Sequence, residues 1–236
     1  MEPQSISALI KYFGRRFSTE LGINLDGNDP NEVFKWFVAS VLYGARISET
    51  IVKNTYKQFE RDGLLSPKKI LEAGWNGLVT SLDAGGYVRY DFKTADKFLE
   101  LVKNLIEQYE GNINNVHESA IDSLDLENRL KGLAKGIGEV TVNIFLRELR
   151  GIWSKADPLP QSLEILAARN LGLIKAHRGK APERKKVLND LRKIWSENAI
   201  KGYRFSDFEA ALVRLGKDYC RRRLCERCVL KSYCVV

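Results

Sequence analysis

The sequence is poor in features that would direct it to a membrane, to histidine-based catalysis or to a β-sheet. Its longest apolar runs, such as residues 38–43, are far too short to span a bilayer. It has only two histidines, His117 and His177, and neither has the neighbours of a metal site or a catalytic triad. No alternation of apolar and polar residues lasts long enough to predict a strand.

The start of the chain, MEPQSISALIKYFGRRF, lacks the charged-then-apolar layout of a signal peptide and a small-residue cleavage site. Cysteine is absent from the chain before Cys220, so disulfides do not staple distant segments as they do in secreted proteins. We therefore expect a cytoplasmic protein, associated with the nucleoid if the source is prokaryotic.

The 236 residues suffice for one large domain or two small ones that share a core, and 44% of them are hydrophobic. There are 38 basic and 30 acidic residues, which gives a formal net charge of +8. Excess positive charge favours polyanionic partners through counterion release. A basic protein without such a partner can have the same charge balance, so charge alone does not show whether a polyanion binds.

Helix start and stop signals recur along the chain. Residues 29–32, Asp-Pro-Asn-Glu, predict an N-cap, a first-turn proline and a capping-box acid. Ser48 and Ser66 predict two further helix starts. The expected helix ends are glycines, namely Gly63, Gly74 and Gly111. The pattern predicts an all-α protein of roughly ten helices, with a loop at residues 177–186.

Residues 134–143, AKGIGEVTVN, place Gly136 and Gly138 between two apolar helical stretches. Glycines permit positive φ and the close approach of another chain. Such a turn exposes amide N–H groups at the start of the next helix, where the helix dipole favours an anion such as a DNA phosphate. Lys131 and Lys135 would add positive charge. Taken alone, the pattern also fits a tight turn between two packed helices.

All four cysteines lie in the last 17 residues, at Cys220, Cys225, Cys228 and Cys234. Thiolates are soft ligands, and four in one short segment suit either a [4Fe–4S] cluster or tetrahedral zinc. Four unligated thiols beside arginines would be prone to oxidation. The sequence therefore predicts one metal centre at the end of the chain.

Four segments together resemble the endonuclease III superfamily of DNA glycosylases, the HhH-GPD proteins. LKGLAKGIGEVTVNIFL is similar to the helix–hairpin–helix of that family, whose pattern is LxxLPGVGxKTAxxxL. Upstream, LIEQYEGNI resembles the segment before that motif, and VLYGARISE resembles the family's duplex-probing LLSAQATD. Downstream, CERCVLKSYC keeps the spacing C-x2-C-x5-C. The segments lie in the family's order and cover nearly the whole chain.

The resemblance implies two helical lobes with a DNA cleft between them. Residues 27–152 would form a six-helix barrel that ends in the helix–hairpin–helix. Residues 1–26 and 153–236 would form a discontinuous lobe with a [4Fe–4S] cluster, zinc being the alternative. The family's first cysteine interval is x6 whereas here it is x4, so we expect a tighter turn at Cys220. Nearby basic residues would face DNA phosphates, although a solvated surface explains them too: Arg221, Arg222, Arg223, Arg227 and Lys231.

The resemblance also assigns the residues of the chemistry. A polar side chain fills the gap left by the flipped nucleotide, and the matching position is Arg46. The Schiff-base lysine of bifunctional members corresponds to Val140, so lysine-dependent AP lyase activity is excluded by this route. The catalytic aspartate corresponds to Asp157 if a short insertion is allowed, and to Pro160 otherwise. Lys155 is a further candidate amine.

These assignments predict a base-excision repair enzyme, a monofunctional DNA N-glycosylase that hydrolyses the glycosidic bond of a damaged or mismatched base. The alternatives are a catalytically inactive protein that binds DNA lesions or structures, and a zinc-stapled protein-interaction module. We expect a monomer that binds double-stranded DNA, with no membrane and no small-molecule substrate. The expected DNA contacts are Lys135, Gly136, Ile137, Gly138 and Arg46. Three aromatic residues line either the base pocket or, as we expect, the core: Trp36, Tyr43 and Tyr87.

Overall fold

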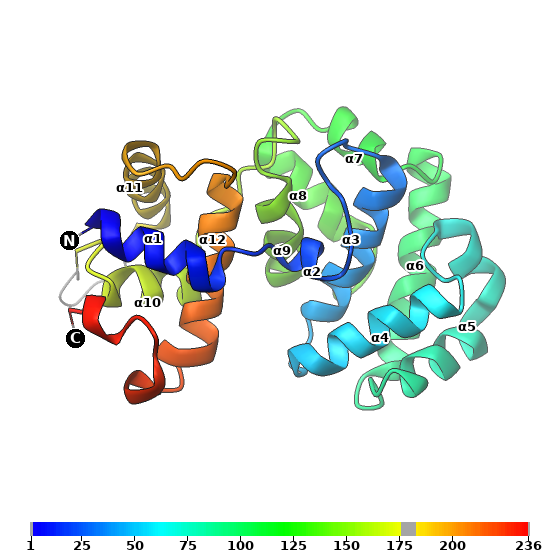
Figure 1. Ribbon diagram of the computed structural model, residues 1–236. Helices are drawn as coiled ribbons and strands as arrows, with labels where there is room; N and C mark the ends of the chain where they lie inside the picture. The colour runs from blue at the N-terminus through cyan, green and yellow to red at the C-terminus, as the bar shows by residue number, and fades with distance from the viewer. Residues whose placement is uncertain (1, 176–182, 236) are drawn as a thin grey trace. The chain divides into compact units, whose positions relative to one another are not determined.

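The computed structural model describes residues 2–175 and 183–235, and this part of the chain contains helices and no strand (Figure 1). The all-α prediction is therefore confirmed, although twelve α-helices are present in the described residues instead of roughly ten. None of these helices is both long and apolar enough to cross a bilayer. The helices are α1 (Glu2–Phe13), α2 (Phe17–Glu20), α3 (Pro30–Tyr43), α4 (Glu49–Arg61), α5 (Pro67–Ala84), α6 (Asp91–Tyr109), α7 (Ile113–Ser119), α8 (Ser123–Gly132), α9 (Glu139–Leu149), α10 (Ser162–Asn170), α11 (Arg184–Glu197) and α12 (Phe205–Leu215).

The chain divides into two compact units. The continuous unit comprises Ser18–Asp157, and the discontinuous unit comprises Met1–Phe17 with Pro158–Val236. The sequence placed its lobe boundaries at other points, with a barrel at residues 27–152. Asp157, the candidate catalytic residue, is thus the last residue of the continuous unit.

The predicted helix starts are formed by side-chain caps. Asp29 Oδ1 accepts hydrogen bonds from the backbone N–H groups of Asn31 and Glu32 at 2.8 and 3.2 Å, ahead of α3. The hydroxyls of Ser48 and Ser66 accept in the same way at the starts of α4 and α5. Each cap satisfies an N–H group that has no partner inside the helix.

The predicted capping box at Glu32 is wrong. Its carboxylate does not return to Asp29 but accepts from the backbone N–H of Asn24 at 2.8 Å and binds Lys35 Nζ at 2.6 Å. Glu32 therefore fastens the preceding loop to α3, because that loop brings an N–H group within reach of the carboxylate.

Glycines with positive φ lie at the points where the sequence predicted that helices end. Gly63, Gly74 and Gly111 have φ values of 73°, 63° and 72°. Gly74 lies within α5 and breaks it into two helical segments at a kink. The loop predicted at residues 177–186 is wrong at its end, because α11 begins at Arg184. Residues 177–182, His177 among them, lie outside the described residues.

The continuous unit has aromatic side chains at its core. Trp36 is fully buried, and its Nε1–H donates to the carbonyl of Phe145 at 3.1 Å. Tyr87 is also fully buried, and its hydroxyl donates to the carbonyl of Leu42 at 2.8 Å. Both are core residues, as predicted. Tyr43 is half-buried, with its ring 6.4 Å from that of Trp36.

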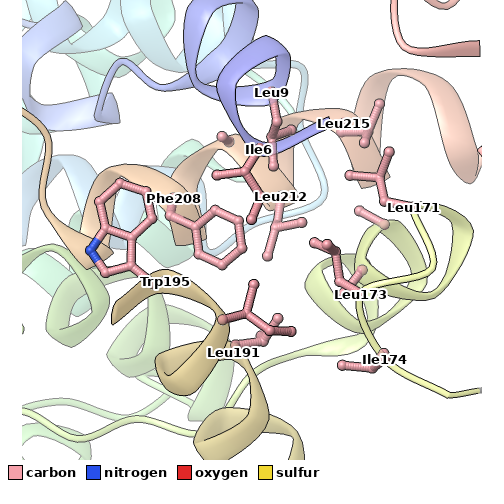
Figure 2. Close-up of a cluster of buried hydrophobic side chains, with 14 of the residues drawn as sticks. Ile6, Leu9, Leu171, Leu173, Ile174, Leu191, Trp195, Phe208, Leu212 and Leu215 are labelled. Atoms are coloured by element: carbon pink, nitrogen blue, oxygen red, sulfur yellow. The ribbon is translucent and has the colours of Figure 1, made fainter. Parts of the chain in front are cut away.

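The discontinuous unit has a separate apolar core, to which α1, α11 and α12 contribute together with the turn that follows α10 (Figure 2). The rings of Trp195 and Phe208 stack within it at 5.4 Å. Three cysteines of the chain end, Cys220, Cys228 and Cys234, pack against this core. The cysteine segment is therefore anchored on a buried apolar cluster.

Candidate nucleic-acid interface and cysteine site

The glycine turn joins α8 to α9, and its residues alternate between exposed and buried positions. Gly136 has φ +89° and is exposed, whereas the Ile137 side chain is only 5% exposed. The Ile137 N–H donates to the carbonyl of Ala134 at 3.1 Å, which closes the turn. Ile137 therefore anchors the turn in the core, and it offers a DNA contact through its backbone alone.

The start of α9 presents amide groups to solvent. Gly138 is the N-cap of α9 and has no side chain to cap it. Within the described part of the chain, no protein acceptor meets the N–H of Gly138 or Val140. These donors lie at the positive end of the helix dipole, where an anion is favoured. The Val140 side chain is 49% exposed, so an apolar side chain without an amine lies at this surface.

Two side chains of α6 border the turn, and no residue close to the turn in the sequence indicates either of them. A Cβ atom at Gly136 would lie 3.1 Å from Lys97 Cε and 3.6 Å from its Nζ. The Lys135 N–H donates to Glu100 Oε2 at 3.0 Å. Burial lowers the pKa of the Lys97 ammonium group. The turn thus has a half-buried cation beside it, and one of its amides is already bound by the protein's own carboxylate.

The two lysines predicted near the turn differ in their surroundings. Lys131 Nζ lies 3.4 Å from Glu127 Oε2, one helical turn earlier on α8. Its charge is therefore partly balanced, and it contributes less to an anion site than expected. The Lys135 side chain is exposed and remains a candidate contact.

The loop after α3 packs directly against the start of α9. A Cβ atom at Gly44 would lie 2.1 Å from Thr141 Oγ1, so the Thr141 side chain packs this closely against the loop only because residue 44 is glycine. Beyond Gly44, the N–H of Ile47 donates to the carbonyl of Ala45 at 2.9 Å and closes a three-residue turn. Arg46 is at the centre of that turn, exposed and without a hydrogen bond or ion pair among the described residues. The structure thus brings the predicted probing loop against the start of α9, the helix that follows the glycine turn.

Asp157 is held by an arginine at the other end of α9. Its Oδ1 pairs with Nη1 of Arg150, the C-cap residue of that helix. The Arg150 side chain is 7% exposed and that of Asp157 is 41% exposed. The carboxylate is therefore accessible and at the same time tethered to a buried guanidinium. Pro160, its alternative in the sequence, is buried and has no acidic group.

His117 has neighbours that its sequence context did not reveal. Its ring stacks on Trp153 at 4.9 Å with an interplanar angle of 15°. The backbone N–H of Lys155 donates to His117 Nε2 at 3.4 Å, and Lys155 Nζ donates to the His117 carbonyl at 2.8 Å. Burial and the nearby Lys155 charge lower the pKa of His117, while Glu118 opposes this shift. Lys155 binds the end of α7, so it is not a free amine nucleophile.

Cys220 ends a widened helical turn. Residues Gly216–Cys220 form a π-type turn after α12, with the Arg221 N–H donating to the Gly216 carbonyl at 2.9 Å. A Cβ atom at Gly216 would lie 2.2 Å from the Leu163 carbonyl oxygen, so only glycine fits. Arg223 then has φ +55° and reverses the chain. The turn that presents Cys220 is wider than expected, and the tight turn in the shortened interval follows it.

The other three thiols are close enough to Cys220 to affect its ionisation. Burial raises the pKa of Cys220 to about 11, and its three partner thiols raise it as well, while a hydrogen bond from Asn170 opposes the shift. Among the described residues, no three His, Cys, Asp or Glu side chains converge in an ion-binding arrangement. Four neighbouring soft donors nevertheless fit the chemistry of a [4Fe–4S] cluster or of zinc.

The basic residues near the cysteines differ in whether a neighbouring acidic residue balances their charge. Arg221, Arg222, Arg223 and Arg227 are exposed. Lys231 Nζ lies 2.5 Å from Glu226 Oε2, so part of the lysine's charge is balanced. The four arginines are thus the exposed cations of this segment for which no ion pair is described.

A cavity of about 730 Å³ lies on α4 and the end of α5, away from the predicted residues. Its lining combines both charges: Asn54, Lys57, Glu60, Arg61, Asp83, Ala84, Gly85 and Gly86. None of the predicted site residues lines it.

In comparisons with known proteins, no family model matches this chain. No curated protein matches it either.

Proposed function

We propose that this protein is a monofunctional DNA N-glycosylase of base-excision repair, which hydrolyses the glycosidic bond of a damaged or mismatched base. The observation that carries the proposal is the contact between Gly44 and Thr141. This contact brings the loop that holds the exposed Arg46 against the start of α9, the helix that follows the Gly136–Gly138 turn. A glycosylase needs both segments on one surface, which supports the proposal.

The duplex backbone would bind at the glycine turn. The unpaired N–H groups of Gly138 and Val140 donate to a phosphate, and Lys97 and Lys135 add positive charge. Arg46 enters the duplex and fills the gap that a flipped nucleotide leaves, because its guanidinium can both stack and hydrogen-bond. These contacts do not depend on the identity of the base, so other residues of the protein would recognise the base.

Bond cleavage would depend on Asp157. Its carboxylate stabilises the positive charge that develops on the sugar and directs a water molecule to it. Arg150 orients the carboxylate through the ion pair at the end of α9. The side chain of Val140 cannot attack the sugar, so no Schiff base forms and the abasic strand stays intact.

The cysteine segment would hold a [4Fe–4S] cluster through Cys220, Cys225, Cys228 and Cys234, with zinc as the alternative. When bound, the metal centre cross-links the end of the chain as a structural staple. Equal iron and sulfide content with a broad visible absorption band supports the cluster. A colourless, zinc-loaded protein contradicts it.

A panel of duplex oligonucleotides tests the proposed activity. Its members contain uracil, thymine opposite guanine, oxidised pyrimidines, 8-oxoguanine, alkylated bases or an abasic site. The proposal predicts excision of at least one base, with strand breakage only after heat or alkali. Asp157→Asn should abolish excision and leave duplex binding intact. Excision that survives this substitution overturns the role of Asp157.

A second candidate is a DNA-binding protein without catalysis. It is favoured by the pairing of Asp157 with Arg150. A carboxylate whose charge is already balanced by a guanidinium stabilises a sugar cation less well. Tight lesion binding without excision across the whole panel would support this candidate. DNA affinity that falls steeply with salt would exclude the third possibility, a zinc-stapled protein-interaction module.

A further inference from the structure

The segment that leads to Asp157 folds into a turn whose first and last residues are buried. Trp153 is 1% exposed, and its Nε1–H donates to Oδ1 of Asn28 at 2.9 Å. Ala156 is 4% exposed, and its N–H donates to the carbonyl of Trp153 at 3.0 Å. Residues 153–156 therefore form a closed turn directly before the proposed catalytic carboxylate.

His117, near the end of α7, binds this turn through its ring and its backbone. The ring stacks on Trp153 with 4.9 Å between the ring centroids and an interplanar angle of 15°. Its Nε2 accepts from the backbone N–H of Lys155 at 3.4 Å and lies 3.3 Å from Ser154 Oγ. The His117 carbonyl accepts from Lys155 Nζ at 2.8 Å. One residue of α7 thus contacts three consecutive residues of the turn.

The Lys155 contact determines which form of the imidazole is needed. A backbone N–H can only donate, so the Nε2 atom that faces it carries no proton. The ring proton is then on Nδ1, and the Ser154 hydroxyl can donate to the same Nε2. His117 thus serves this turn as a neutral hydrogen-bond acceptor.

The turn also determines where the Asp157 carboxylate lies. The Arg150 ion pair holds Oδ1 at the tip of the side chain, whereas the turn sets the position of the main chain from which that side chain projects. Both matter, because a catalytic group must be held within about 0.5 Å of its productive position. A displacement of about 1 Å can lower a rate about 100-fold. The Lys155 N–H, two residues before Asp157, is the point at which the His117 ring holds this main chain.

We propose that His117 is a positioning residue for Asp157, whose neutral imidazole holds the backbone of Lys155 and thereby fixes the turn that presents the carboxylate. This inference rests on the proposed function of Asp157 and extends the site to α7. Ring packing alone would make a different demand, because stacking on Trp153 needs an aromatic side chain and no acceptor.

Two substitutions in the full chain separate the acceptor from the ring. His117→Phe keeps a ring that can stack on Trp153 and lacks an acceptor. His117→Gln lacks the ring and offers an amide oxygen near the position of Nε2. The control is Ser154→Ala, which removes the other group beside Nε2 and leaves the Lys155 N–H in place.

Each variant is compared with the wild type in activity, binding and local protection. Steady-state kinetics give kcat and KM for a base that the wild type excises, and fluorescence anisotropy gives the affinity for the duplex. Hydrogen exchange at the Lys155 amide, followed by NMR, reports the contact with His117 without any need of activity. Circular dichroism checks the fold. Should His117→Phe fail to fold, His117→Leu, which also lacks an acceptor, takes its place.

His117→Phe should lower kcat about 10- to 100-fold, with KM and duplex affinity unchanged, because the carboxylate acts only in the chemical step. Its Lys155 amide should exchange at least about 10-fold faster than that of the wild type. His117→Gln should retain most of the activity and of the protection. Ser154→Ala should match the wild type in all measurements.

The outcomes separate this inference from the proposed function. Unchanged kcat in His117→Phe overturns the role of His117 alone, whether or not the Lys155 amide exchanges faster. A larger loss of kcat in His117→Gln than in His117→Phe does the same, because the ring and not the acceptor would then be required. A wild type that excises no base, or excision that survives Asp157→Asn, overturns the proposed function and this inference with it.

Discussion

Gly44, in the loop after α3, lies directly against the side chain of Thr141 at the start of α9. A Cβ atom at Gly44 would lie 2.1 Å from Thr141 Oγ1 and 3.3 Å from its Cβ. Thr141 is 4% exposed, so its side chain has little room to move. Since Gly44 has φ −66°, space and not backbone strain requires glycine here.

Gly44→Ala should therefore destabilise the fold by about 1–3 kcal/mol, the usual effect of overpacking a filled site. Urea denaturation followed by circular dichroism measures the change. Gly132→Ala is the control, because a Cβ atom at Gly132 meets nothing within 4 Å. Thr141→Ala, combined with Gly44→Ala, should restore part of the loss by removing Oγ1. Equal stability of Gly44→Ala and Gly132→Ala would show that the two segments do not pack as described.

Lys97 should contribute to DNA affinity although it lies on α6, far from the glycine turn in the sequence. Lys97→Met keeps the apolar stem that crosses Gly136 and removes the ammonium group. We expect weaker duplex binding and a slope of log affinity against log salt that is smaller by about 0.9, the value for one phosphate contact. Fluorescence anisotropy over a salt series measures both quantities. Lys103→Met, on an exposed position of the same helix, should keep the wild-type slope. A parallel loss in both variants would assign the effect to overall charge.

Local sequence signals predicted much of the secondary structure. Asp29, Ser48 and Ser66 cap helices as expected, because a cap depends on residues within one turn of it. Glu32 did not complete its capping box, since the loop at Asn24 offers a competing donor. That competition depends on where the loop folds, which the four-residue motif does not contain.

The candidate site was predictable only in part. The glycine turn and the cysteines are contiguous motifs, so the sequence identified them directly. Lys97 and Glu100 border the turn from another helix, and nothing within residues 134–143 indicates them. The partners of Asp157 and His117 likewise depend on tertiary folding. Sequence reasoning therefore named the carboxylate but not the arginine that holds it.

His117 should make stability depend on pH. Its pKa is lowered in the folded protein from the ordinary value of 6.5, so the unfolded chain takes up the proton first as pH falls. The contribution of His117 to the free energy of unfolding should therefore be complete above about pH 6.5. It should decrease as the pH is lowered below that value. Protonation would also convert the Nε2 acceptor of the Lys155 N–H into a donor.

Urea denaturation of the wild type and of His117→Gln at pH 8, 7, 6 and 5.5 measures this effect. The glutamine variant should lose less stability over the range, because it retains a polar side chain that does not titrate. Trp153 fluorescence should report the same transition in the wild type, as its indole stacks on the His117 ring. Parallel stability curves for the two proteins would contradict the assignment.

Borohydride trapping tests the consequence of Val140. With an abasic duplex and sodium borohydride, we expect no covalent protein–DNA adduct, because the Val140 side chain cannot form an imine. Denaturing gel electrophoresis detects the adduct, and a lysine-dependent lyase run in parallel serves as the positive control. A strong adduct that disappears in Lys155→Met would instead make that amine the nucleophile.

The most direct test of the account is duplex binding by Gly138→Asp. A Cβ atom at Gly138 meets nothing within 4 Å and its φ is −108°, so the substitution fits the backbone. Aspartate is also a favoured N-cap residue, so the melting temperature should stay the same or rise. Its carboxylate would occupy the amides at the start of α9 and repel a phosphate. We predict that duplex affinity, measured by fluorescence anisotropy, falls at least about 10-fold relative to the neutral isostere Gly138→Asn, one decade corresponding to about 1.4 kcal/mol. Unchanged affinity in a folded Gly138→Asp protein would contradict the account.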